Sequence, residues 1–297
     1  MQNAAPVQLN QVRDFGQIIS ATFQFLKQNW RPLLRALAVT CLPLALLSGF
    51  FMGKTMGDIQ SLSFGEQVND PTAMFSGMME SMLPLMLGYL LMVAAFLLMM
   101  AVSYEYLRAY HFGEHMDITP GALFQRAIGN IGSYLGSSVL SIVLFMVGLM
   151  LCVLPGFYVL SVLALVFACI AFERSGAVAS LSRSNELVNG HFWEVLGLVI
   201  VIGLIQWLIT AALMLPFTIV SMVVTFNSTF DAITTQGAPA LPPWMTFFTA
   251  VSTALQMAVS ILTYPIVCVA LSMKYFSLKE TKEGTSLRAK VQGFEEA

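Results

Sequence analysis

Long apolar stretches alternate with short polar ones along the whole chain. A helix of about 20 apolar residues crosses the ~30 Å hydrocarbon core of a bilayer, and six stretches reach or approach that length. The last two are longer than a bilayer needs, so we expect them to tilt, kink or project. The pattern predicts an all-α, polytopic membrane protein with six transmembrane helices, at residues 33–53, 82–104, 134–153, 157–172, 192–226 and 244–276.

Amphipathic segments precede the first, third and fifth predicted spans. The first is expected from Phe15 to Leu26 and should end at the polar residues that lead to Asn29. The second begins at Pro120 and continues to Ile131. With the third, described next, they form a weak threefold repeat of one amphipathic helix and two spans. We expect all three helices to lie at the cytoplasmic surface of the membrane.

A polar stretch at residues 173–197 lies between two apolar runs and should join the fourth and fifth spans. Val178, Leu181 and Val188 recur at helical spacing, which predicts a short helix with an apolar face. Ser175 is expected to cap its start and Gly190 to end it. One interpretation is a surface connector anchored by aromatic residues. The other is a lipid or partner contact, for which the candidate residues are Glu173, Arg174, Arg183, Glu186, His191 and Trp193.

Small residues and prolines predict local features of the spans. Glycines at every fourth position let a neighbouring helix approach closely. Pro43 predicts a kink in the first span, and the tripeptide at 154–156 predicts a tight turn before the fourth span. The glycines expected to lie at helix contacts are Gly49, Gly53 and Gly57 in the first span, and Gly129, Gly132 and Gly136 near the third.

Composition excludes several classes of protein. Hydrophobic residues make up 57% of the chain and charged residues only 10%, with a mean hydropathy of +0.78. Soluble domains carry about 25% charged residues. The net charge of −2 and the scattered basic residues do not indicate nucleic-acid binding. All four cysteines lie in apolar runs without a CxxC pattern, so we expect buried thiols and no metal or redox cofactor.

The basic residues predict the orientation. In the six-span arrangement thirteen of the fourteen lie on one side and only Lys54 on the other, which places both termini in the cytoplasm. We expect residues 1–277 to form one membrane domain without a cleaved signal peptide, and residues 278–297 to form a charged cytoplasmic tail. The thirteen are Arg13, Lys27, Arg31, Arg35, Arg108, Arg126, Arg174, Arg183, Lys274, Lys279, Lys282, Arg288 and Lys290.

A metal site is considered at His111 and His115, which are four residues apart with Glu114 and Asp117 nearby. Gly113 interrupts any helix that would place both imidazoles on one face. A solvated turn is therefore the preferred interpretation, and no metal ligand is assigned.

Several short motifs resemble the membrane domain attached to bacterial glycerophosphodiester phosphodiesterases, and related stand-alone integral membrane proteins. The resemblance implies a six-helix protein of the bacterial inner membrane. The hydrolytic part of the two-part enzymes is a soluble barrel of about 250 residues, and only a short tail follows the sixth predicted span here, so phosphodiesterase activity is not implied. The motifs are Phe15-Gly16 with Ile18 and Ile19, Asn29, Leu154-Pro155-Gly156, Glu173, Leu181, Arg183-Ser184, Leu187, Gly190-His191-Phe192-Trp193 and Leu196-Gly197.

Three functions are weighed from the sequence. Membrane enzymes and proton-coupled transporters usually place ionisable residues inside the bilayer. In the predicted arrangement Arg35, Glu194 and Lys274 lie near span ends and none lies deep in the bilayer, so no catalytic residue is assigned. The leading hypothesis is a non-catalytic membrane protein that organises lipid or a partner protein through its cytoplasmic amphipathic helices. A passive or lipid-type transporter is the alternative. A membrane-embedded hydrolase using Glu173, Arg174, His191 and Glu194 is the second alternative, and the oligomeric state is left open.

Overall fold

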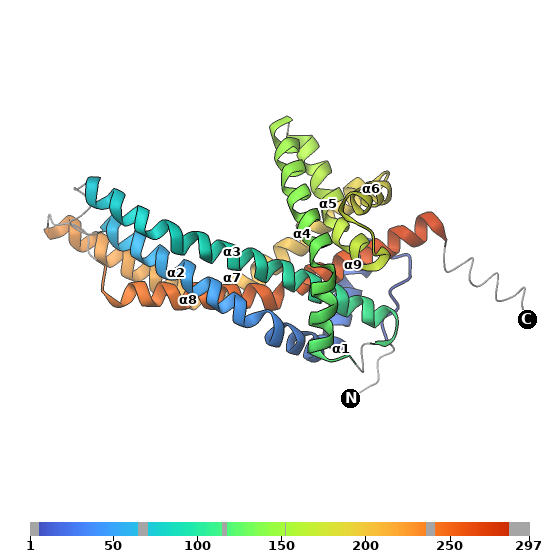
Figure 1. The fold of residues 1–297 in the computed structure, drawn as a ribbon, viewed down its shortest axis with the longest axis horizontal. Helices are drawn as coiled ribbons and strands as arrows, with labels where there is room; N and C mark the ends of the chain where they lie inside the picture. Colours follow the sequence, from blue (N-terminus) through green and yellow to red (C-terminus); the bar gives the residue numbers. More distant parts are fainter. Residues whose placement is uncertain (1–5, 65–70, 115–117, 152, 236–240, 285–297) are drawn as a thin grey trace, which may run out of the picture. The chain divides into compact units, whose positions relative to one another are not determined.

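The computed structural model describes residues 6–64, 71–114, 118–151, 153–235 and 241–284, and within them the chain forms helices and no strand. In this described part of the chain, five helices are long and apolar enough to cross a membrane, or six if the bent pair formed by the first two counts as one span. The fold is therefore an all-α polytopic membrane protein, as predicted. The helices are α1 (Phe15–Thr40), α2 (Leu42–Phe64), α3 (Pro71–His111), α4 (Pro120–Leu151), α5 (Val153–Glu173), α6 (Ala177–Val188), α7 (Phe192–Thr235), α8 (Trp244–Thr263) and α9 (Pro265–Glu283) (Figure 1).

The chain divides into two compact units. Helices α1, α4, α5, α6 and α9 belong to unit 1, whereas α2 and α8 belong to unit 2. Helices α3 and α7 each contribute one end to unit 1 and the other to unit 2. Unit 1 comprises Met1–Thr40, Leu97–Gln206 and Tyr264–Ala297, and unit 2 comprises Cys41–Phe96 and Trp207–Thr263.

Unit 2 is held together by the close contact of α2 with α8. A Cβ atom added to Gly49 would lie 2.5 Å from Cα of Ala254, and one added to Gly53 would lie 2.7 Å from Cα of Ala250. Gly57 meets Thr246 in the same way, at 2.9 Å. Each distance is shorter than a carbon contact allows, so the glycines let the two backbones touch. The prediction of a helix contact along this glycine stripe is confirmed.

The second group of glycines behaves differently. A Cβ atom added to Gly129 or Gly132 would meet no described atom within 4 Å, and one added to Gly136 would lie 3.6 Å from Cβ of Ala177. The prediction of close packing is therefore wrong at the first two positions. Small residues permit a close approach but do not require one. Helix α4 does pack against α5, which lies beside it in Figure 1.

Helix α1 differs from the prediction because it passes through Asn29 without a break. The Asn29 side chain is buried, and its Nδ2 donates to the carbonyl of Phe25 at 3.1 Å. Tyr106 donates to Oδ1 of the same residue at 3.3 Å. Because the amide is satisfied inside the helix, the polar residue does not end it. The expected amphipathic helix and the start of the first span thus form one helix, which ends at Thr40, close to the kink predicted from Pro43.

Other helix ends also differ from the predicted positions. The break before α5 falls at residue 152, so the tripeptide at 154–156 lies in the first turn of α5 and is not the predicted turn. Pro155 fits there because the first turn of a helix needs no backbone donor. The segment 120–131 is continuous with α4. Of the three expected amphipathic helices, only α6 is separate.

Helix α9 lies in the middle of unit 1, where it packs against α1, α5 and α6. Met273, Tyr275 and Leu278 are among its buried residues, and Ser277 accepts a hydrogen bond from the backbone of Arg13 at 3.0 Å. Helix α9 continues to Glu283, so the first residues of the segment expected to form the charged tail are helical. The remainder of that predicted tail, 285–297, lies outside the described residues.

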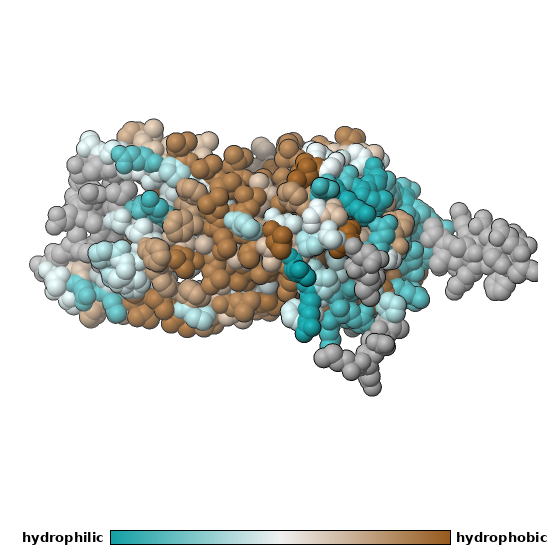
Figure 2. All heavy atoms as spheres, turned by 60° about the horizontal axis from the view of Figure 1, so that its bottom comes forward, coloured by the Kyte–Doolittle hydropathy of each residue, from teal (hydrophilic) through white to brown (hydrophobic). Residues whose placement is uncertain are grey.

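Much of the surface is apolar, as Figure 2 shows in brown. Leu83, Met150 and Met222 are examples of large hydrophobic side chains that are exposed. A soluble protein rarely exposes such continuous apolar surface, whereas a lipid bilayer covers it. The cysteines at 41, 169 and 268 are buried free thiols, and Cys152 lies outside the described residues.

Candidate functional site

The charged residues of unit 1 gather around α6 and the ends of its neighbours. Helix α6 ends as predicted, with Gly190 in the left-handed region at a φ of 85°. It packs through Ser180, Ser184, Leu187 and Val188, and the Ser184 hydroxyl donates to the carbonyl of Val162 on α5. Serines suit this face because their small side chains bond backbone carbonyls at close range.

One expectation for α6 is wrong and one is refined. Val178, expected on the apolar face that meets the bilayer or the helix bundle, is 73% exposed and so does not pack against the bundle. Ser175 does not cap the helix, because the N-cap residue is Gly176 and the Ser175 hydroxyl pairs with that of Ser180 at 2.6 Å. The packed face of α6 thus combines the hydroxyl groups of Ser180 and Ser184 with Val188, which the spacing predicted.

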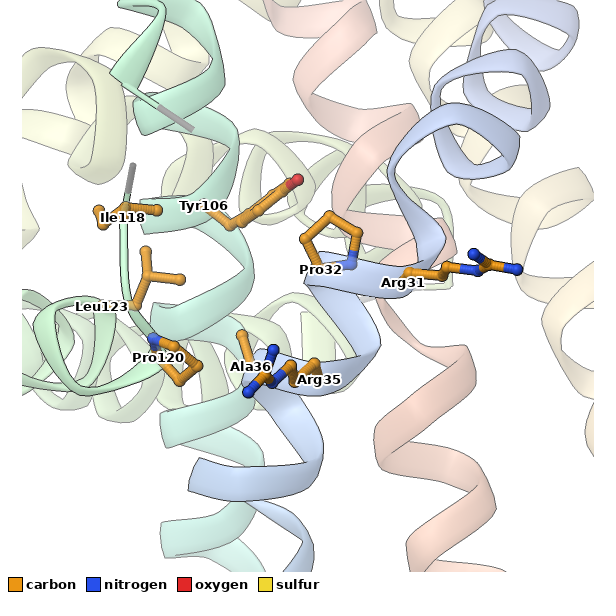
Figure 3. A pocket seen from close by; sticks show the side chains of 8 residues that line it. All are labelled: Arg31, Pro32, Arg35, Ala36, Tyr106, Ile118, Pro120 and Leu123. Carbon is orange, nitrogen blue, oxygen red and sulfur yellow. The ribbon is translucent and has the colours of Figure 1, made fainter. Parts of the chain in front are cut away.

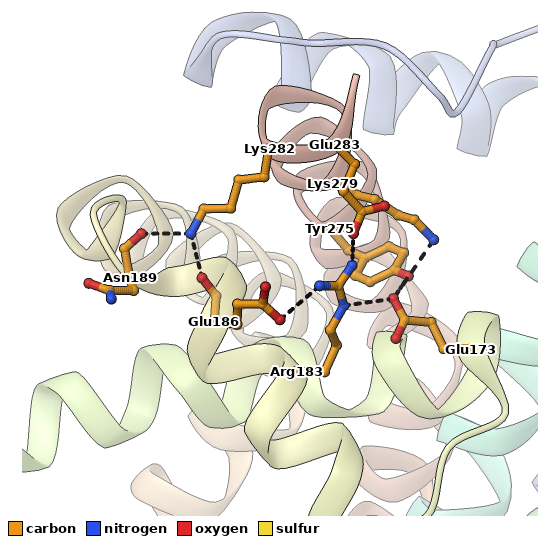
Figure 4. Close-up of polar contacts among 8 residues, drawn as sticks. All are labelled: Glu173, Arg183, Glu186, Asn189, Tyr275, Lys279, Lys282 and Glu283. Carbon is orange, nitrogen blue, oxygen red and sulfur yellow. Dashed lines mark hydrogen bonds and ion pairs between the residues drawn. The ribbon is translucent and has the colours of Figure 1, made fainter. Parts of the chain in front are cut away.

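Arg183 is the centre of an ion-paired cluster that joins α6 to α5 and α9 (Figure 4). Its Nε donates to Oε1 of Glu173 at 3.1 Å and its Nη1 to Glu186 at 2.9 Å, and its Nη2 contacts Glu283. Burial alone lowers the pKa of Arg183, but hydrogen bonds to Glu186 and Glu173 outweigh it and raise the pKa above the usual arginine value. Arg183 therefore stays positively charged and links α6 to α5 and α9.

Helix α9 completes this cluster. Tyr275 donates to Oε1 of Glu173 at 2.6 Å, and Nζ of Lys279 lies 3.8 Å from the same oxygen. Lys282 donates to the carbonyls of Glu186 and Asn189 at the C-terminal end of α6 (Figure 4). A cation at that end satisfies free carbonyls and interacts favourably with the helix dipole.

Arg174 belongs to a different group. Its Nη2 lies 2.9 Å from Oε2 of Glu105, whose side chain is only 1% exposed. The amide of Asn130 donates to Oε1 of Glu105 at 3.0 Å. Of the candidate contact residues, Arg174 therefore pairs with α3, whereas Glu173 and Arg183 pair with each other.

A cavity of about 280 Å³ lies beside Arg174 and is lined by three arginines. Arg126 pairs with Glu114 at 2.8 Å. Arg108 lies over the Phe112 ring at 5.4 Å, and its buried Nε has no hydrogen-bond partner among the described residues. We call the guanidinium groups of Arg108, Arg126 and Arg174 the arginine cluster. They come from the end of α3, the start of α4 and the residue after α5.

The remaining candidates lie near the start of α7. His191 Nδ1 is 3.3 Å from Glu194, and Glu194 also accepts from the nearly buried Lys274 at 2.6 Å. Trp193 contacts the Phe192 ring and is 74% exposed. Glu186 is similarly open to the surroundings, so Glu186 and Trp193 form the outward part of the site.

A second pocket, of about 320 Å³, opens beside α1 (Figure 3). Arg31 and Arg35 line it together with Tyr106, Pro120 and Leu123. The Arg31 guanidinium extends away from Leu123 in Figure 3 and lies 5.4 Å from the ring centre of the exposed Trp30. Neighbouring basic and aromatic side chains are typical of the headgroup level of a membrane.

The histidines offer little chemistry in the part of the chain that the structure describes. His111 lies among the rings of Phe112, Phe172 and Phe276, and His191 bonds Glu194. The described residues contain no group of three or more histidine, cysteine, aspartate or glutamate side chains able to hold a metal ion. His115 and Asp117, which the sequence analysis considered as ligands, lie outside the described residues.

Unit 2 has a polar pocket of its own between α7 and α8. Its volume is about 210 Å³, and a hydroxyl or amide group is present on most of the side chains that line it. The lining residues are Met214, Phe217, Thr218, Ser221, Ser252, Thr253 and Gln256.

No protein-family model, curated protein or solved structure matches the chain. The geometry of the residues is therefore the only guide to function.

Sequence reasoning missed the charged partners that are far apart in the chain. Glu105 was placed just after the second span, yet α3 continues to His111 and buries this carboxylate. Lys274, Tyr275 and Lys279 were not considered as site residues. A signal was present, since α9 repeats polar groups every three to five residues, but only the fold shows that they face α5, α6 and α7.

Proposed function

We propose that this chain is a non-catalytic protein of the bacterial inner membrane that organises anionic lipid at its cytoplasmic face. The observation that carries the proposal is the placement of arginines near exposed tryptophans, within α1 and at the start of α7. Arg31 accompanies Trp30 on α1, and Trp193 follows the charged cluster around Arg183. Anionic headgroups attract basic residues, and tryptophan prefers the interface.

The pairing of the charged groups supports a structural role over catalysis. Glu173 accepts hydrogen bonds from Arg183 and Tyr275, and Glu194 accepts from Lys274. A carboxylate that serves as a general base is usually poised with a free lone pair beside a nucleophile. These carboxylates instead join helix ends, so the proposed hydrolase set of Glu173, Arg174, His191 and Glu194 is divided between separate contacts.

The orientation and the family likeness are parts of the same proposal. Thirteen basic residues on one side of the six-span arrangement support cytoplasmic termini. The resemblance to the membrane domain of glycerophosphodiester phosphodiesterases is supported by the role of two motif residues, since Arg183 anchors α6 and Gly190 ends it.

Native mass spectrometry of the full-length chain, extracted gently, tests the proposal. We expect phosphatidylglycerol to stay bound in preference to phosphatidylcholine, and its retention to fall when Arg31 and Arg35 are both changed to Gln. The matched control is Lys27→Gln, which removes one exposed charge outside the pocket. Equal retention of both lipids by the unaltered chain contradicts the proposal. If another protein stays bound and no lipid does, the chain organises a partner protein instead.

A transport function is the second candidate, and the hydroxyl-lined pocket of unit 2 favours it. Thr218, Ser221 and Gln256 offer hydrogen bonds to a small polar solute within an otherwise apolar unit. Solute flux into liposomes that contain the protein tests this. Flux that Ser221→Leu and Ser252→Leu abolish supports transport, whereas flux no faster than in liposomes without protein rejects it.

A further inference from the structure

We infer that the arginine cluster forms a binding site for a phosphate group. The inference rests on the proposed function, because it names the ligand class recognised at the same charged face. Arg108, Arg126 and Arg174 line one cavity of about 280 Å³. That volume is roughly nine times the ~30 Å³ share of one liquid water, so a phosphate group with part of its substituent fits.

The charges around the cavity leave an excess of positive charge. Two carboxylates are close to the arginines: Glu114 pairs with Arg126 and Glu105 pairs with Arg174. Three guanidinium groups against two carboxylates leave one positive charge, which is that of Arg108. An anion is the ligand class that this arrangement favours.

Arg108 supplies the donor that the protein itself leaves unused. Its Nε is buried and has no hydrogen-bond partner among the described residues, and the Phe112 ring covers one side of the guanidinium. A buried donor without an acceptor is destabilising. Phosphate oxygens in the cavity would accept from the part of the Arg108 guanidinium that lines it, and the planar guanidinium matches phosphate geometry.

The other two arginines are placed by the fold. Glu105 is buried on α3, and it holds Arg174 at 2.9 Å just after the end of α5. Asn130 of α4 bonds the same carboxylate, so α3, α4 and the end of α5 meet around one buried anion. Glu105 is a positioning residue because it would act on the ligand only through Arg174.

The position of the cavity indicates two sources for the phosphate. The arginines lie at the ends of three span-length helices, which is where phospholipid headgroups occur. The cavity is also open on one side, so a soluble phosphate compound reaches it equally well. The shared chemistry is a phosphate monoester or diester.

The test measures the melting temperature of the full-length chain in detergent against rising inorganic phosphate, with sodium chloride at matched ionic strength. We expect phosphate to stabilise the unaltered chain, and Arg108→Gln to weaken the apparent affinity by roughly 10- to 100-fold, as loss of a hydrogen bond to a charged group implies. Lys27→Gln, which removes an exposed charge outside the cavity, should bind as the unaltered chain does. A parallel arm replaces inorganic phosphate with nanodiscs that contain phosphatidic acid or only phosphatidylcholine.

The two arms identify the source. If inorganic phosphate raises the melting temperature and the rise depends on Arg108, the ligand is a soluble phosphate compound. If only phosphatidic acid raises the melting temperature, the ligand is a lipid headgroup. If Arg108→Gln prevents folding, Glu114→Gln takes its place, because release of Arg126 from its carboxylate should tighten binding about two- to fivefold. The inference is overturned if both variants respond to phosphate and phosphatidic acid as the unaltered chain does. Should lipid retention still depend on Arg31 and Arg35, the phosphate site fails while the proposed function stands.

Discussion

The Nε atom of Arg183 lies 3.1 Å from Oε1 of Glu173, and this contact ties α6 to the end of α5. Tyr275 donates to the same oxygen from α9, so one carboxylate holds three helices together. Arg183 and Glu173 are both partly buried, which keeps the contact from being fully screened by solvent.

Replacement of Glu173 by Gln should therefore destabilise unit 1. The amide keeps the shape but loses the charge that Arg183 requires, and we expect a cost of about 1–2 kcal/mol, below the full value for a buried pair because the group is part-exposed. Glu186→Gln is the matched control, since Glu186 contacts the same arginine from an exposed position, and its cost should stay below about 0.5 kcal/mol. Thermal unfolding in detergent measures both. Equal melting of the two variants would show that Glu173 is not a structural anchor.

The two faces of α6 should respond differently to an introduced charge. Leu187 is fully buried, so Leu187→Asp places an unpaired carboxylate in the packed face and should cost more than about 3 kcal/mol. Val178→Asp alters an exposed position and should leave the melting temperature within the range of an ordinary surface change, about 0.5 kcal/mol. If Val178 faces lipid, the second variant should also retain less phosphatidylglycerol. A strong loss of stability from Val178→Asp alone would reverse this assignment of the faces.

The glycine stripe on α2 should tolerate no side chain. Gly53→Ala brings a methyl group against the backbone of Ala250, and we expect a loss of about 1–3 kcal/mol from the forced separation of α2 and α8. Gly132→Ala is the control, because the space around Gly132 is open among the described residues. Alanine stabilises a helix by up to about 1 kcal/mol relative to glycine, so this variant should be neutral or more stable. If both variants change the stability in the same direction, the close contact of α2 with α8 is contradicted.

The proposed orientation is tested by cysteine labelling in intact cells with a membrane-impermeant maleimide. Thr235 at the end of α7 and Thr281 near the end of α9 are both exposed and suit cysteine substitution. Thr235→Cys should react and Thr281→Cys should be protected until the cells are opened. The chain without an added cysteine controls for the native thiols. Labelling of Thr281→Cys alone would invert the orientation.

The sequence predicted features that depend on local chemistry or on regular spacing. Apolar stretches located the span-length helices, and Gly190 located the end of α6. Glycines at every fourth residue located the contact of α2 with α8. In each case the signal lies within a few neighbouring residues. The backbone and the bilayer impose these constraints whatever the rest of the fold does.

Features that depend on distant partners were not predictable. Asn29 looks like a helix end until Tyr106, 77 residues later, supplies a hydrogen bond. Glu105 looks like a polar residue beyond a span until Arg174, 69 residues later, pairs with it. The same applies to Arg183, whose contact with Glu283 bridges 100 residues. Tertiary contacts override the local structural preference at these positions, and the periodicity of the sequence does not predict such contacts.

The central claim, that anionic lipid collects at the charged end of unit 1, is tested most directly by photo-crosslinking. The full-length chain would be reconstituted with photoactivatable phosphatidylglycerol or phosphatidylcholine, and the labelled peptides mapped. We expect phosphatidylglycerol to label the peptides around Arg31, Arg108 and Trp193 several-fold more than phosphatidylcholine does, while both label the apolar segments of α4 and α7 equally. Identical labelling patterns for the two lipids, or release of a hydrolysed lipid product during the incubation, would contradict the claim.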